Sequence, residues 1–91
     1  MRSRTELAKW CREERERCLR DLNDALAEFD SGYPVALKIE VLRMRIDHCE
    51  RAFDGVPVTD REKQEAATRI FEALGRDYAI RNPGARADSL G

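Results

Sequence analysis

The sequence has no apolar run longer than three residues, and Val35-Ala36-Leu37 is one of these runs. A membrane-spanning helix needs about 20 predominantly apolar residues, and the core of a signal peptide needs about 7 to 15. The first ten residues, MRSRTELAKW, contain no such core. We therefore expect a chain that does not span a membrane and is not exported, with the cytoplasm as its location.

The sequence also lacks an excess of positive charge, because 17 Lys and Arg residues face 18 Asp and Glu residues, for a formal net charge of -1. A protein whose main task is to bind nucleic acid usually presents a surplus of Lys and Arg to the phosphates. Glycine-rich phosphate loops are absent as well, since the five glycines are isolated from one another. This composition argues against nucleic acid as the main partner and against a nucleotide site.

The three cysteines and the single histidine have neither metal-binding nor catalytic spacing. No CxxC pair is present, and the adjacent His48 and Cys49 would point about 100° apart on a helix. Cys11 and Cys18 would lie roughly 10 Å apart along one helix, which is too far for a disulfide. Most carboxylates have an Arg or Lys at helical spacing, as surface ion pairs do. We expect reduced, buried cysteines, no metal, no cofactor and no enzymatic activity.

Local signals divide the chain into three helices. Residues 3–6 (SRTE) and 59–62 (TDRE) have the spacing of capping boxes, which mark helix starts. Glycine and proline in segments 30–34 (DSGYP) and 54–57 (DGVP) indicate the breaks between helices. These signals predict one helical domain over residues 1–80, with helices at about 4–30, 34–53 and 60–80. Residues 81–91 have turn residues and no apolar period, so we expect a flexible C-terminal tail.

The first and third helices each show one apolar face. The face predicted for the first helix consists of Leu7, Cys11, Cys18, Leu22, Ala25 and Phe29, widened by Leu19 and Leu26. The face predicted for the third helix consists of Ala66, Ala67, Ile70, Phe71, Leu74 and Tyr78. Trp10 lies at the margin of the first face, where it would either cap the core or anchor an interface.

The second helix, 34–53, carries two apolar rows. The first has the 4, 3, 4, 3, 4 spacing of a coiled-coil seam, and it contains Val35, Ile39, Leu42, Ile46, Cys49 and Phe53. The second has 4, 3, 4 spacing, and it contains Leu37, Val41, Met44 and His48. On a helical wheel the rows centre roughly 145° apart, so a single neighbouring helix cannot cover both.

Three arrangements would cover both rows of this helix. The second helix could lie between the other two in a flat layer, or one row could contact a second copy of the chain or a different protein. We expect the longer, stricter seam to form the core within the chain, and the shorter row to contact another chain. This interpretation favours a homodimer, with an interface that would contain Leu37, Val41, Met44, Arg45, His48 and Trp10.

The sequence thus predicts an all-α protein, either a three-helix antiparallel bundle or a helical hairpin plus a third helix, with coiled-coil-like packing and a dimeric state. Such a chain is typical of a small protein-binding module, for example an adaptor, chaperone or inhibitor whose protein partner the residues do not identify. An alternative is a small regulatory or phage-type protein that binds nucleic acid or blocks a nucleic-acid-binding machine. A steep salt dependence of affinity would indicate direct phosphate contacts.

Overall fold

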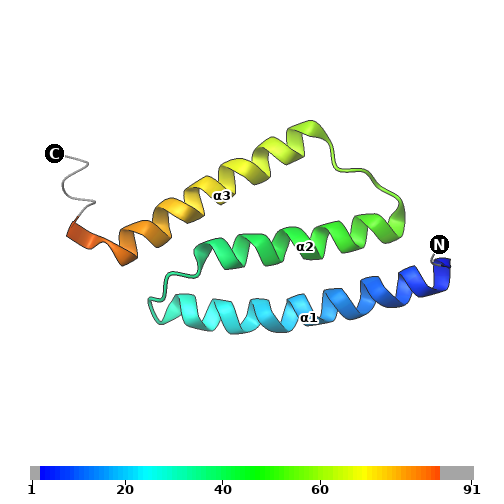
Figure 1. Cartoon of the computed structure of the whole chain (residues 1–91), viewed down its shortest axis with the longest axis horizontal. Helices are drawn as coiled ribbons and strands as arrows, with labels where there is room; N and C mark the ends of the chain where they lie inside the picture. Colours follow the sequence, from blue (N-terminus) through cyan, green and yellow to red (C-terminus); the bar gives the residue numbers. More distant parts are fainter. Residues whose placement is uncertain (1–2, 85–91) are drawn as a thin grey trace.

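The computed structural model describes residues 3–84 and is all-α over this range. Helix α1 spans Arg4–Asp30, α2 spans Ala36–Asp54 and α3 spans Asp60–Arg81 (Figure 1). The predicted all-α class is confirmed, and each helix starts and ends within two residues of the expected position. Arg81, which the sequence assigned to the tail, is the last residue of α3. The remainder of the predicted tail lies largely outside the described residues.

The helix ends follow local chemistry. Both predicted capping boxes are present, one between Ser3 and Glu6 and one between Thr59 and Glu62. Gly55 caps the C-terminal end of α2, and its φ of 71° lies in the left-handed region that glycine adopts without steric cost. The start of α2 differs, because Val35 stands at the N-cap position and offers no side-chain hydrogen bond. The free backbone N–H groups of this helix therefore need an acceptor from elsewhere in the fold.

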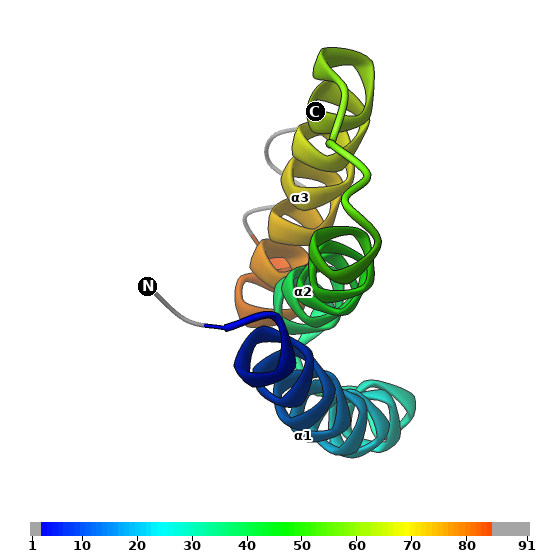
Figure 2. The ribbon, with the colours of Figure 1, turned by 90° about the vertical axis from the view of Figure 1, so that its right-hand side faces the viewer.

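The three helices form a row with α2 in the middle. Helices α1 and α2 form a hairpin, and α3 lies against the other side of α2, as the end-on view in Figure 2 shows. No Cα atom of α1 lies within 8 Å of one in α3. The principal extents are 56 × 29 × 18 Å, which describe a flat and elongated molecule. This is a hairpin plus a third helix and not a closed bundle, so α2 has a neighbouring helix on each of two sides.

The apolar core lies between α1 and α2. Its buried centre consists of Cys18 and Ala25 from α1 with Ile39 and Leu42 from α2. Partly buried side chains surround this centre, namely Leu22, Leu26, Phe29, Val35 and Ile46. The coiled-coil seam of α2 therefore faces α1, as its spacing predicts.

The expectation that Phe53 belongs to this core is wrong, because 54% of the residue is exposed. Phe53 lies in the last turn of α2, at the open end of the hairpin. There it borders a shallow recess whose α1 side is formed by Ala8, Cys11, Arg12 and Arg15. These neighbours include no large apolar side chain that could cover an aromatic ring.

All three cysteines are free and buried at the α1–α2 contact, as predicted. Burial raises the pKa of the Cys18 thiol, and the nearby Glu14 carboxylate adds to this effect. Burial also raises the pKa of Cys49, with smaller contributions from Cys11 and Glu14. Thiols in this state are protonated at neutral pH and are poor nucleophiles.

Candidate interaction surface

Helix α3 presents a different face to α2 from the one its sequence predicts. The side chains on the α2 side are those of Ala66, Ile70, Ala73 and Asp77, and the last two are buried. The larger apolar residues of the predicted face are exposed, with 76% exposure for Phe71, 45% for Leu74 and 56% for Tyr78. The apolar face predicted for this helix therefore does not pack as one surface. The pattern consists of two neighbouring rows, and α2 packs on the row of smaller side chains.

Asp77 explains why α2 packs on this row. The Asp77 carboxylate accepts a hydrogen bond from the backbone N–H of Ala36 at 2.8 Å and another from that of Leu37 at 3.1 Å. These N–H groups belong to the first turn of α2, which has no side-chain cap of its own. A negative charge is favourable at this position because the helix dipole places partial positive charge there. Asp77 thus acts as the missing N-cap of α2.

Polar contacts also hold the other end of α3. The Arg51 guanidinium donates hydrogen bonds to the Glu62 carboxylate and to the carbonyl oxygen of Pro57, the latter at 3.2 Å. The hydrogen bonds from Arg51 hold the pKa of the Glu62 carboxyl below its usual value, and the Thr59 hydroxyl acts in the same sense. Arg51 also pairs with Asp47 one helical turn earlier. This cluster fixes the loop that joins α2 to α3.

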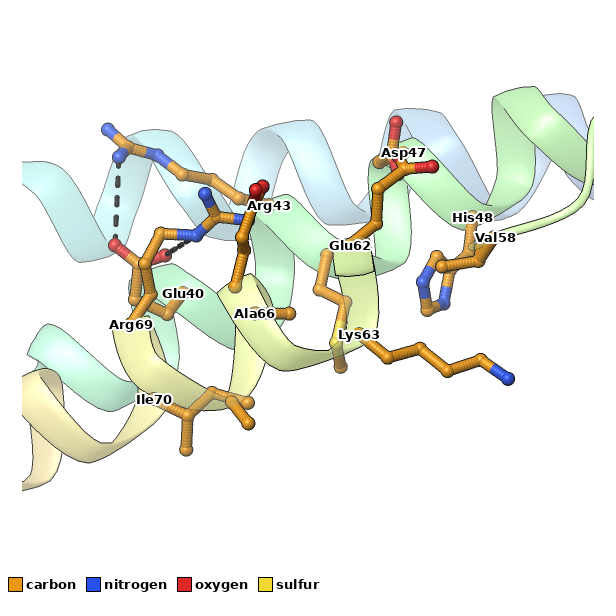
Figure 3. A pocket seen from close by; sticks show the side chains of 13 residues that line it. Glu40, Arg43, Asp47, His48, Val58, Glu62, Lys63, Ala66, Arg69 and Ile70 are labelled. Atoms are coloured by element: carbon orange, nitrogen blue, oxygen red, sulfur yellow. Dashed lines mark ion pairs between the residues drawn. The ribbon is translucent and has the colours of Figure 1, made fainter. Parts of the chain in front are cut away.

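Between these two attachments the helices diverge and leave a cleft of about 460 Å³. Figure 1 shows α3 approaching α2 at the N-terminal end of α2 and moving away from it toward the other end. The apolar lining comes from Met44, Val58, Ala66, Ala67 and Ile70. Figure 3 shows Glu40 on one side of the cleft, paired with both Arg43 and Arg69 across 3.8 and 3.9 Å. Charges of both signs at the rim therefore largely balance one another.

Most of the exposed apolar residues of α3 form a continuous row, which we call the α3 seam. Its members have the 4, 3, 4 spacing of a coiled-coil contact, and they are Ala67, Phe71, Leu74 and Tyr78. At about 100° per residue, the α3 seam centres roughly 100° around the helix from the side that faces α2. The row therefore points out of one broad side of the flat layer.

The shorter apolar row of α2 points out of the same broad side. We call this row the α2 stripe, and its members are Leu37, Val41, Met44 and His48. Contacts of Ala36, Glu40 and Arg51 with α3 define the direction that faces α3, and Val41 lies about 100° further around the helix. In both helices, the rotation from the side that faces the other helix to the apolar row runs in the N-to-C sense of the helical turn. Because α2 and α3 are antiparallel, the two rotations lead to the same broad side of the layer. The α2 stripe and the α3 seam thus form one composite apolar surface.

The residues predicted as an interface are partly covered and partly open. Leu37, Val41 and Met44 are half-buried, whereas Arg45 and His48 are exposed. Arg45 lies close enough to the Glu14 carboxylate to help lower its pKa, although a hydrogen bond from Arg17 has the largest effect. Trp10 is also exposed, at the open end of the hairpin. The role of these residues in binding another chain stays a prediction.

The sequence analysis did not identify Asp77 as a cap of α2, and it did not separate the α3 seam from the rest of the apolar face. One signal was available for both, because Ala66, Ile70, Ala73 and Asp77 also have 4, 3, 4 spacing and place one acidic residue in an apolar row. A second signal was the start of α2, where the sequence offers Val35 in place of a capping Ser, Thr, Asp or Asn.

Residues 3–84 contain neither a candidate metal cluster nor a membrane-spanning helix. Within this range, no three or more His, Cys, Asp and Glu side chains gather in a way that could hold a metal ion. Over the same range, no helix is long and apolar enough to cross a membrane. Comparison with models of protein families, with curated proteins and with solved structures found no match for this chain.

Proposed function

We propose that this chain is a small protein-binding module of the cytoplasm, which acts as an adaptor, chaperone or inhibitor by docking a helical partner on its composite apolar surface. The observation that carries the proposal is the exposed α3 seam. Phe71, Leu74 and Tyr78 lie on one side of one helix at coiled-coil spacing, and they continue into the α2 stripe. Contiguous apolar surface of this kind is typical of protein contact sites.

The energetics of the fold support this proposal. The buried apolar residues of the described chain are mostly small, since Ile39 and Leu42 are the largest of them. Helix α3 contributes Ala73 and Asp77 to the buried set, while its large side chains remain in contact with water. Covering an aromatic or leucine side chain contributes about 1.5–3 kcal/mol when it becomes fully buried. A partner helix on the α3 seam would supply the burial that the chain alone does not.

Affinity capture with matched variants tests the proposal. Tagged parent protein, Leu74→Glu and Ile80→Glu would each be incubated with host lysate that also contains an untagged copy of the chain. Ile80 is a suitable control because it lies on the same helix with 43% exposure, and six residues of helical turn place it about 120° away from Leu74. We expect Leu74→Glu to lose a protein that both the parent and Ile80→Glu retain. Identical capture by all three would contradict the proposal.

A further inference from the structure

We propose that the occupant of the composite surface is a second copy of this chain, with α3 of each copy packed antiparallel on the α2 stripe of the other. This inference rests on the proposed function and specifies its partner. The two-fold axis would run along the helices between α2 and α3, so that these helices and their symmetry mates form a four-helix core. Each copy would then contribute the same surface, as in an isologous dimer.

The positions of the two rows along the helix axes fit this arrangement. Within one chain, Leu37 is level with Asp77 and Arg51 is level with Glu62, which places Val41 level with residues 71–74. An axis parallel to the helices preserves these levels. Val41 of one copy would therefore lie between Phe71 and Leu74 of the other, and the equal 4, 3, 4 spacing of both rows would allow their side chains to interdigitate.

The charges beside the two rows favour this pairing over a pairing of two α2 stripes. On the α1 side of the α2 stripe stand Lys38 and Arg45, both exposed. An antiparallel pairing of two α2 stripes would bring these cations toward their own symmetry mates. The outer flank of the α3 seam carries Gln64, Thr68 and Gly75, none of which is charged. An α3 helix can therefore approach Lys38 and Arg45 without opposing a like charge.

The exposed area is of the size that such a dimer needs. At about 200 Å² for a full aromatic side chain, Phe71 and Tyr78 alone expose roughly 260 Å² in each copy. When Leu74 and the exposed part of the α2 stripe are added and both copies are counted, the total buried area approaches the roughly 1,000 Å² expected of a specific interface. We therefore expect an equilibrium between monomer and dimer that depends on protein concentration.

Complementary charges test the specific contact. Light scattering after size exclusion should give the parent a mass near twice the 10.5 kDa of the chain at high concentration. Leu74→Lys and Val41→Glu should each be monomeric and helical by circular dichroism, while Ile80→Lys should remain dimeric. An equimolar mixture of the two monomeric variants should restore a dimer. In the mixed dimer, one of the two contacts between positions 41 and 74 pairs Lys with Glu, and the other keeps the native Val and Leu.

A milder experiment covers the case in which a charged variant loses its helical structure. Val41→Cys and Leu74→Cys introduce no charge, and oxidation of their equimolar mixture should give a disulfide-linked dimer that neither variant gives alone. The oxidised parent controls for the buried native cysteines. A covalent dimer formed by Leu74→Cys alone would show that two α3 seams pair with each other, and would overturn the proposed contact.

Failure of this inference is distinguishable from failure of the proposed function. A parent that stays monomeric at all concentrations, with a captured protein lost only in Leu74→Glu, would overturn the second copy as occupant and leave the surface as a site for a different protein. A monomeric parent whose captured proteins are the same for Leu74→Glu and Ile80→Glu would overturn both.

Discussion

The Asp77 carboxylate in α3 accepts a hydrogen bond from the backbone N–H of Ala36, the first residue of α2, at 2.8 Å. These residues are 41 positions apart, so the contact closes a long segment of chain. Asp77 is only 5% exposed and supplies the N-cap that Val35 does not provide. One carboxylate therefore both completes α2 and fixes the position of α3, which in turn sets the direction of the α3 seam.

Replacing Asp77 with alanine should destabilise the protein by about 1–2 kcal/mol, because loss of an N-cap leaves backbone donors unsatisfied. Urea denaturation measures this change, and hydrogen exchange at Ala36 and Leu37 should become faster. Asp24→Ala is a suitable control, since Asp24 is an exposed carboxylate of α1. That substitution should stay within about 0.5 kcal/mol of the parent. Equal destabilisation by both variants would contradict the capping role of Asp77.

Acid should weaken the attachment at the other end of α3. The hydrogen bonds from Arg51 lower the pKa of Glu62 in the folded state, so this pair stabilises the fold above the usual glutamate pKa near 4.3. Its contribution is lost as the pH falls through the lowered pKa of the folded state. Denaturation midpoints measured between pH 7 and pH 3 should therefore decrease less steeply for Glu62→Gln than for the parent.

The comparison with Glu62→Gln is necessary because Glu14 titrates in the same direction. A hydrogen bond from Arg17 lowers the pKa of Glu14, and this pair remains intact in both proteins. The difference between the two pH profiles thus isolates Glu62. Parallel profiles would mean that the contact between Arg51 and Glu62 does not stabilise the folded chain.

The cysteines should react slowly in the native protein. All three are buried, and burial raises the pKa of both Cys18 and Cys49, which lowers the fraction of reactive thiolate at neutral pH. We expect slow labelling by a disulfide reagent at pH 7 and rapid labelling of three thiols in denaturant. Rapid labelling of all three in the native state would show that the hairpin between α1 and α2 opens readily.

The local parts of this fold could be predicted from the sequence because their causes are local. The capping boxes at Ser3 and Thr59 lie within four-residue segments, and Gly55 ends its helix through its own backbone conformation. The coiled-coil seam of α2 was also recognisable, since Ile39 and Leu42 follow a single strict period and find their partners on the adjacent helix. Phe53 follows the same period but lies where the hairpin opens.

The orientation of α3 could not be predicted in the same way, because it depends on a contact between distant parts of the chain. Hydrophobic periodicity assigns Phe71, Leu74 and Tyr78 to a core face, since it weighs apolar side chains alone. In the structure the unsatisfied N–H groups of Ala36 and Leu37 select the row that contains Asp77. A hydrogen-bond requirement in one helix thereby leaves the larger apolar row of another exposed.

Two exposed glycines should respond oppositely to substitution by alanine. Gly55 has a φ of 71° at the end of α2, where an added Cβ strains the left-handed backbone and should cost about 1 kcal/mol. Gly75 lies within α3, and a Cβ built there would meet no atom within 4 Å. Gly75→Ala should therefore stabilise the protein by about 0.5–1 kcal/mol, since alanine has the higher helix propensity. Thermal and urea unfolding of both variants check these signs. Destabilisation by Gly75→Ala in the monomeric chain would mean that α3 is not a continuous helix through this position.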